Sequence, residues 1–125
     1  MSGFDPDALE AMRTVRTIEI ETSRGPGRPV HQTTVWIVVD EAERAFVRSE
    51  FGERGRWFRE LLANPSGAVH VGSTRIPIHA EHAADPDRIA ACSRALSAKY
   101  RTSRGSLAVM LRDEVLESTL QLHPA

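Results

Sequence analysis

The sequence contains a single cysteine, Cys92, and no run of about 18 apolar residues of the kind that spans a membrane. One cysteine excludes an intramolecular disulfide and any zinc site built from several cysteines, which fits a reducing compartment. The N-terminus, Met-Ser-Gly-Phe-Asp-Pro-Asp, has neither the basic start nor the apolar stretch of a secretory signal. We therefore expect a cytoplasmic protein that does not span a membrane.

Net charge is almost absent as well, because 16 basic and 17 acidic side chains give a formal net charge of −1. No overall field favours nucleic acid, a membrane surface or a strongly acidic partner, so any anion site must be local. The 125 residues are 41% hydrophobic and 26% charged, which is typical of soluble globular proteins. We expect residues 1–125 to form a single domain.

The first half of the chain predicts a helix followed by three strands. Asp5 is suited to be an N-cap and Pro6 to the first helical position, so a short helix is expected within an N-terminal lead-in of residues 1–14. Alternation of apolar and polar residues predicts the strands, and the two-sided apolar run of residues 35–39 predicts a central strand. The expected elements are a helix at residues 5–12 and strands at residues 15–22, 30–39 and 45–48.

The second half predicts two helices and three more strands. Gly72 and Ser73 are turn residues that indicate a hairpin, and Asp85-Pro86 indicates a helix start. Residues 102–112 are ambiguous between a loop and a short helix. The expected elements are helices at residues 54–63 and 85–99 and strands at residues 68–71, 75–81 and 116–122. Six short strands with few helices predict an α+β fold on an antiparallel sheet or small barrel.

The stretch from Val47 to Trp57 ends a predicted strand, passes through a loop with glycines and enters a helix with arginines at its start. N–H groups at a helix N-terminus carry partial positive charge, and serine and arginine side chains can add hydrogen bonds to a phosphate. Two interpretations stay open here. The stretch is either a phosphate site or a solvated loop rich in arginine. The residues of the first interpretation are Arg48, Ser49, Arg54 and Arg56.

The segment Thr33-Thr34-Val35-Trp36 has hydroxyl and indole side chains that can border a planar ring, while strand N–H and C=O groups bond its heteroatoms. Taken alone, however, an apolar strand with a tryptophan is more often part of an ordinary core.

The five histidines form no strong motif, and no metal site is expected. His79-Ala80-Glu81 lacks the downstream Cys-x-x-Cys of a zinc deaminase, although a haem site with one histidine stays open. Cys92 and Tyr100 lie on the expected apolar stripe of their helix, so both are interpreted as packing residues. No catalytic residue can be named from these patterns.

Taken in order, several short segments resemble the pyridoxamine 5'-phosphate oxidase-like split β-barrels, a superfamily that includes flavin and deazaflavin oxidoreductases. Within it the chain is most similar to an uncharacterised branch of short bacterial proteins. The segments are Arg28-Pro29-Val30, Thr34-Val35-Trp36-Ile37-Val38-Val39, Phe46-Val47-Arg48-Ser49, Arg54-Gly55-Arg56-Trp57-Phe58 and Asn64-Pro65.

This resemblance implies an antiparallel split β-barrel of about six strands with short flanking helices, and a homodimer with the cofactor between the subunits. It also implies that the phosphate is bound by Arg48, Ser49, Arg54 and Arg56, and that the ring system lies along Thr34, Val35 and Trp36 with Trp57 nearby. Many relatives that bind a flavin or deazaflavin have a lysine where this chain has Arg56, and arginine is a planar, forked donor. The identity of the cofactor therefore stays open.

The function implied is that of an oxidoreductase that uses flavin mononucleotide (FMN) or the 8-hydroxy-deazaflavin coenzyme on a small-molecule substrate. In such an enzyme the cofactor supplies the reactive centre, and the protein orients it and excludes water. Two alternatives remain. One is a non-redox split barrel that binds haem or another planar or anionic ligand, and the other is a dimeric module without a cofactor.

Overall fold

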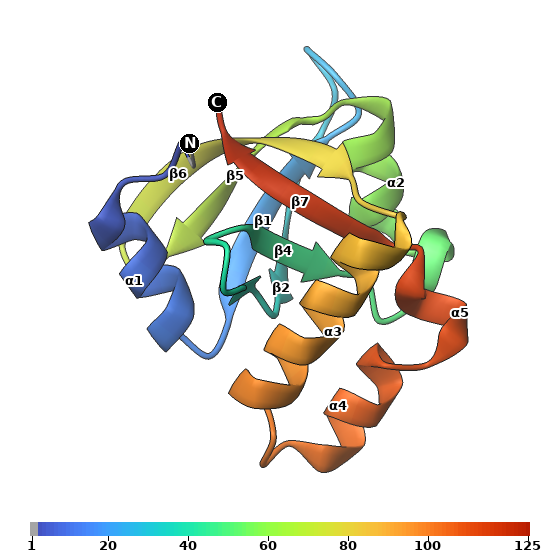
Figure 1. The fold of residues 1–125 in the computed structure, drawn as a ribbon. Coiled ribbons are helices and arrows are strands. Elements are labelled where there is room, and N and C mark those ends of the chain that lie inside the picture. The colour runs from blue at the N-terminus through green and yellow to red at the C-terminus, as the bar shows by residue number, and fades with distance from the viewer. Residues whose placement is uncertain (1–2) are drawn as a thin grey trace.

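The computed structural model describes residues 3–125, so the first two residues of the predicted lead-in lie outside the described part (Figure 1). Its strands are β1 (Ile18–Ser23), β2 (Val30–Val35), β3 (Val38–Val39), β4 (Ala45–Arg48), β5 (Ser66–Val71), β6 (Thr74–His82) and β7 (Thr119–Pro124). Its helices are α1 (Pro6–Thr14), the 3₁₀ turn η1 (Gly52–Arg54), α2 (Arg56–Ala63), α3 (Pro86–Lys99), α4 (Arg104–Met110) and α5 (Asp113–Leu116).

The seven strands form one antiparallel sheet in the order β2-β1-β5-β6-β7-β4-β3. β2 and β3 follow each other in the chain but lie at opposite edges of the sheet. Since only Trp36 and Ile37 separate them, the sheet must curl until its two edges approach each other. The result is the curled half-barrel with flanking helices seen in Figure 1, which confirms the predicted α+β antiparallel class.

Local sequence signals place most of these elements. Asp5 accepts a hydrogen bond from Ala8 N at 2.9 Å, and Asp85 accepts one from Arg88 N at 3.1 Å, so both predicted N-caps are confirmed. Gly72 has φ +62° in the turn between β5 and β6, a conformation that side chains disfavour. The hairpin predicted there is confirmed.

The prediction of one central strand over residues 30–39 is wrong. The segment divides into β2, which pairs only with β1, and β3, which pairs only with β4. Its apolar character on both faces has another cause. Ile37 is buried in the core inside the curled sheet, whereas Val38 packs beneath α3 on the outside. The two faces of this segment are therefore covered by the core and by α3, although the segment is not central in the sheet.

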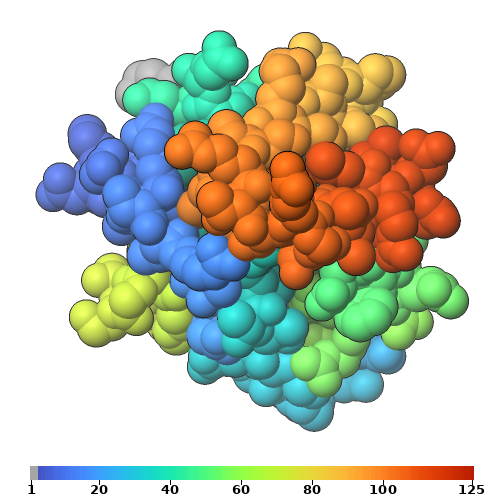
Figure 2. Space-filling model, turned by 90° about the horizontal axis from the view of Figure 1, so that it is seen from below, coloured from blue at the N-terminus to red at the C-terminus, as the bar shows by residue number. Residues whose placement is uncertain are grey.

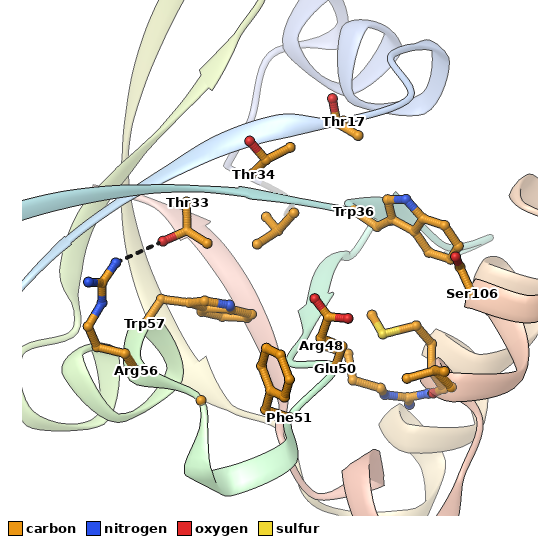
Figure 3. Close-up of a pocket in the computed structure, with 14 residues that line it drawn as sticks. Thr17, Thr33, Thr34, Trp36, Arg48, Glu50, Phe51, Arg56, Trp57 and Ser106 are labelled. Atoms are coloured by element: carbon orange, nitrogen blue, oxygen red, sulfur yellow. Dashed lines mark hydrogen bonds between the residues drawn. The ribbon is translucent and has the colours of Figure 1, made fainter.

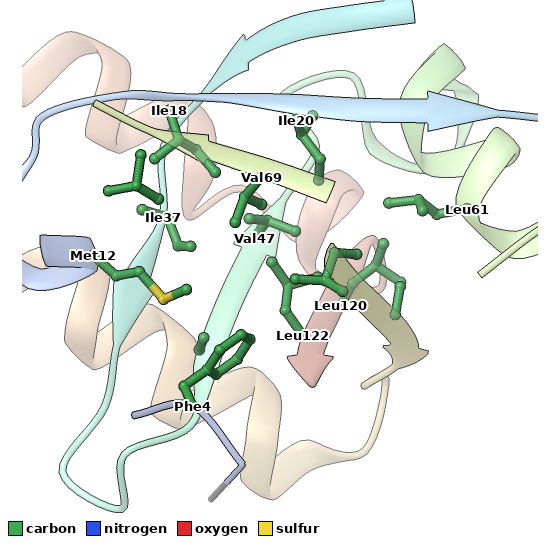
Figure 4. Close-up of a cluster of buried hydrophobic side chains, with 14 of the residues drawn as sticks. Phe4, Met12, Ile18, Ile20, Ile37, Val47, Leu61, Val69, Leu120 and Leu122 are labelled. Carbon is green, nitrogen blue, oxygen red and sulfur yellow. The ribbon is translucent and has the colours of Figure 1, made fainter. Parts of the chain in front are cut away.

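The main core fills the inside of the half-barrel (Figure 4). It joins inward-facing strand residues to Met12 of α1 and Leu61 of α2, and all of its labelled members except Phe4 are at most 2% exposed. A second cluster lies on the outer face of β3 and β4, where α3 contributes Cys92 and Leu96. Burial raises the pKa of the Cys92 thiol to about 11, which leaves it protonated at neutral pH and confirms a packing residue.

The region that was ambiguous, residues 102–112, contains α4, which packs against α3, and α5 follows before the last strand. β7 consequently starts at Thr119, three residues after the predicted start at Leu116. None of the helices in the described part of the chain is long and apolar enough to cross a membrane.

Candidate functional site

A cavity of about 360 Å³ opens where β2, the segment around η1 and α4 meet. Figure 2 shows this hollow between the cyan, green and orange regions of the surface. Four separate stretches of the chain form its walls, namely Thr17, the end of β2, the segment around η1, and the α4 region that the sequence left ambiguous. The lining residues are Thr17, Thr33, Thr34, Val35, Trp36, Arg48, Glu50, Phe51, Gly55, Arg56, Trp57, Ser106, Val109 and Met110.

Six of the eight residues predicted from the sequence lie around this cavity, namely Thr34, Val35, Trp36, Arg48, Arg56 and Trp57. Curling of the sheet brings the end of β2 opposite the start of α2, so residues about 20 positions apart in the chain face the same space (Figure 3). Ser49 and Arg54 do not line it. Ser49 is buried and Arg54 is exposed on η1.

Arg48 lies at the floor of the cavity and is only 2% exposed. Its Nε donates to Thr119 Oγ1 at 2.8 Å, and its Nη2 donates to Ile89 O at 3.0 Å. Its Nη1 donates to Ser93 Oγ and Met110 O, both at 3.0 Å. Four of the five guanidinium N–H groups are thus used within the protein. Every one of these acceptors is neutral, and burial lowers the pKa of the Arg48 guanidinium because it disfavours the charged form.

The N-terminus of α2 faces the cavity through Gly55, Arg56 and Trp57. No side chain among residues 3–125 caps this helix, so the N–H groups of its first turn remain available to a ligand. Arg56 extends along the same wall, and its Nη2 lies 3.4 Å from Thr33 Oγ1 of β2. This end of the cavity combines helix N–H groups, a guanidinium and a hydroxyl, which are the donors that a phosphate accepts.

Ser49 supports the loop that carries this helix start. Its Oγ accepts a hydrogen bond from Phe51 N at 3.2 Å, and a Cβ atom at Gly55 would collide with that same oxygen. Glycine at position 55 therefore allows the loop to close over Ser49 and brings the helix start to the cavity.

Three aromatic rings, those of Trp36, Phe51 and Trp57, also line the cavity. Trp36 stacks on Tyr100 with ring centroids 3.7 Å apart and planes inclined by 2°. The Tyr100 hydroxyl lies 2.8 Å from Arg16 O and 3.3 Å from Ile37 O, so the stack is held in place from behind. Burial raises the pKa of Tyr100 to about 12. Tyr100 does not line the cavity, and its geometry supports a packing role.

Sequence reasoning missed several lining residues. Glu50 and Phe51 lie in the loop that it did identify, but neither matches a phosphate-binding residue type. Ser106, Val109 and Met110 belong to α4, whose helical pattern is too short to be read with assurance from the sequence. The sequence offered one signal that Glu50 could line the cavity. Its carboxylate lies in the loop between Arg48 and Arg56, two residues predicted to bind the ligand.

Comparison with solved structures shows the same fold in several proteins of low sequence identity. Atu2129 from Agrobacterium tumefaciens superposes with a TM-score of 0.63 at 15% identity, over 97% of this chain and 55% of its own, so this chain spans little more than half of that protein. HutZ, the haem storage protein from Vibrio cholerae, gives 0.61 at 16% identity, over 100% and 92% of the two chains. An F420-H2 dependent reductase (FDR-A) gives 0.62 at 13% identity, over 86% and 94%.

At these identities the likeness shows the fold alone. The comparison with curated proteins gave no match. At the level of sequence families, the one described as "Uncharacterized protein conserved in bacteria (DUF2255)" matches residues 8–122.

Proposed function

The chain belongs to this bacterial family, DUF2255, and from that premise we propose that its cavity binds FMN or the 8-hydroxy-deazaflavin coenzyme and that the protein is an oxidoreductase acting on a small molecule. The observation that carries the proposal is one cavity that has hydrogen-bond donors suited to a phosphate at one end and two indole rings beside them. A phosphorylated ligand with a planar ring matches both features at once.

The phosphate end is assigned to the first turn of α2, Arg56 and Thr33. Arg56 and the N–H groups of an uncapped helix provide charge-assisted hydrogen bonds, and Thr33 holds the guanidinium against β2. Arg48 adds an uncompensated buried charge at the floor, with one N–H group left over. Arg54 lies outside the cavity, so within one chain the anchoring role narrows from the predicted arginines to Arg56 and Arg48.

The ring end is assigned to Val35, Trp36 and Trp57, with Thr34 at the rim. The volume of about 360 Å³ lies within the range of cofactor sites. When bound, the cofactor supplies hydride transfer, whereas the protein orients the ring and excludes water. Trp36 is suited to orient the ring of the ligand. Tyr100 stacks on one face of its indole and so fixes the position of the opposite face.

A homodimer is part of this proposal. Phe51 is 66% exposed at the mouth of the cavity, and exposed aromatic residues are typical of surfaces that a partner covers. A second subunit placed there would close the cavity and reduce the access of water to the ring. A solved structure with the same fold is described as a domain-swapped dimer, which supports a dimer at the level of architecture.

Haem is the competing ligand, because HutZ shares the fold. The lining residues favour a flavin or deazaflavin over haem, since iron coordination needs a side-chain ligand. Among the described residues that line the cavity, none is a histidine or cysteine, and Met110 has the only thioether. An arrangement without a strong iron ligand fits an organic ring better than a metal porphyrin.

Titration of the purified protein with FMN, the deazaflavin coenzyme and haem, followed by absorbance and fluorescence, tests the proposal. We expect micromolar binding of FMN or the deazaflavin and weaker binding of haem. Binding of haem alone would replace the oxidoreductase by a haem-binding protein. Binding of none of the three would leave a split-barrel protein with another ligand or none.

A further inference from the structure

Glu50 is the one carboxylate among the residues that line the cavity. It lies two residues after the end of β4, and Figure 3 shows its carboxylate directed into the cavity, away from the loop and between Trp57 and Trp36. The predicted anchoring and ring-contacting residues leave this side chain without a role. Glu50 is exposed in the free protein, and its negative charge on the wall of a cavity assigned to a phosphorylated ligand requires an explanation.

No residue of the described part of the chain satisfies this carboxylate. The ion pairs and hydrogen bonds of the structure include none to Glu50, although two arginines line the same cavity. Arg48 is turned toward neutral acceptors of β7, α3 and α4, and Arg56 toward Thr33 on the opposite wall. In the free protein the Glu50 oxygens are therefore left to water.

Filling the cavity changes the surroundings of Glu50. A planar ligand between Trp36 and Trp57 displaces water from the carboxylate, and an ionised carboxylate that loses water without gaining donors is costly. A ligand that places an N–H group there replaces the lost water with a charge-assisted hydrogen bond. A ligand that places a carbonyl, an anion or a methyl group there does not.

We propose that Glu50 accepts a hydrogen bond from an N–H group on the ring of the ligand, and so selects the orientation and the class of ring that the cavity binds. This inference rests on the proposed function. Flavins and deazaflavins both carry an N–H group in the pyrimidine part of their ring system. Iron occupies the inner nitrogens of haem, so haem offers Glu50 no donor. Glu50 thus separates the two ligand classes that the fold permits.

The test uses two phosphate-free ring probes, lumiflavin and 3-methyllumiflavin, in which a methyl group replaces the pyrimidine N–H hydrogen. Their affinities are measured by fluorescence quenching with the wild-type chain, Glu50→Leu and Glu53→Leu. Leucine keeps the approximate size of glutamate and removes every acceptor. Glu53 is an exposed carboxylate on η1 that does not line the cavity, so Glu53→Leu is the matched control for loss of charge.

We expect the wild-type chain and Glu53→Leu to bind lumiflavin about tenfold more tightly than its methylated analogue, and Glu50→Leu to bind the two equally. A preference that persists in Glu50→Leu would mean that the methyl group is excluded by its size, and would overturn the inference. Equal binding of both probes by the wild-type chain would overturn it as well, while leaving the proposed cofactor site standing. If neither probe binds any of the three proteins, the ring site itself is overturned, and the role of Glu50 with it.

Discussion

Replacing Arg48 with alanine is expected to lower the free energy of unfolding by about 3 kcal/mol or more, a large fraction of the stability of a small domain. The guanidinium joins four elements, because it donates from β4 to Thr119 of β7, Ser93 and Ile89 of α3, and Met110 at the end of α4. Truncation leaves these acceptors without their donor and opens a void among buried groups. Urea unfolding, followed by circular dichroism, measures the loss.

Arg94→Ala is the matched control, since Arg94 is exposed on α3 and its loss should change the unfolding free energy by less than about 0.5 kcal/mol. Arg48→Lys should recover only part of the stability, because an ammonium cannot reach acceptors spread around a planar fork. A loss below about 1 kcal/mol in Arg48→Ala would contradict a structural role and leave Arg48 free to act mainly on a ligand.

Replacing Arg56 with alanine is expected to weaken the binding of FMN or the deazaflavin coenzyme by about tenfold or more. Its guanidinium lies at the cavity wall beside the free N–H groups of α2, where it is assigned to the phosphate. Arg54→Ala removes the same charge two residues earlier, outside the cavity, and should change the affinity by no more than about twofold. Calorimetric titration of both variants measures the difference.

Riboflavin, which lacks the phosphate, provides a second control on the ligand side. The wild-type protein should prefer FMN to riboflavin, and Arg56→Ala should lose most of that preference because the two losses report on one interaction. Equal weakening by Arg54→Ala and Arg56→Ala would show that only the general charge of this loop matters. It would also favour a solvated, arginine-rich loop over a phosphate site.

Elements with a local cause could be predicted from the sequence. The N-caps Asp5 and Asp85, the turn at Gly72 and the stop of α2 at Asn64-Pro65 each follow from the chemistry of a few adjacent residues. The split of residues 30–39 could not be predicted in this way. It depends on where α3 packs and on how far the sheet curls, which are properties of contacts between distant parts of the chain.

The candidate site shows the same division. Arg56 could be identified because a strand, a loop and a helix start follow one another in the sequence, whereas Trp57 followed from the family resemblance. The role of Ser49 as a support for the loop, rather than a group facing the cavity, depends on its contact with Gly55 across the turn. Met110 and Ser106 could not be placed, because α4 is short and reaches the cavity only by packing against α3.

The most direct test of the central claim uses the indole N–H resonances of the ¹⁵N-labelled protein during titration with FMN or the deazaflavin coenzyme. The chain has only two tryptophans, Trp36 and Trp57, and both line the cavity, so every indole signal reports on the proposed site. Trp36→Phe assigns the two signals. The account predicts that both signals shift and that they saturate together with cofactor binding. Binding that leaves both signals unmoved would place the cofactor elsewhere and contradict the account.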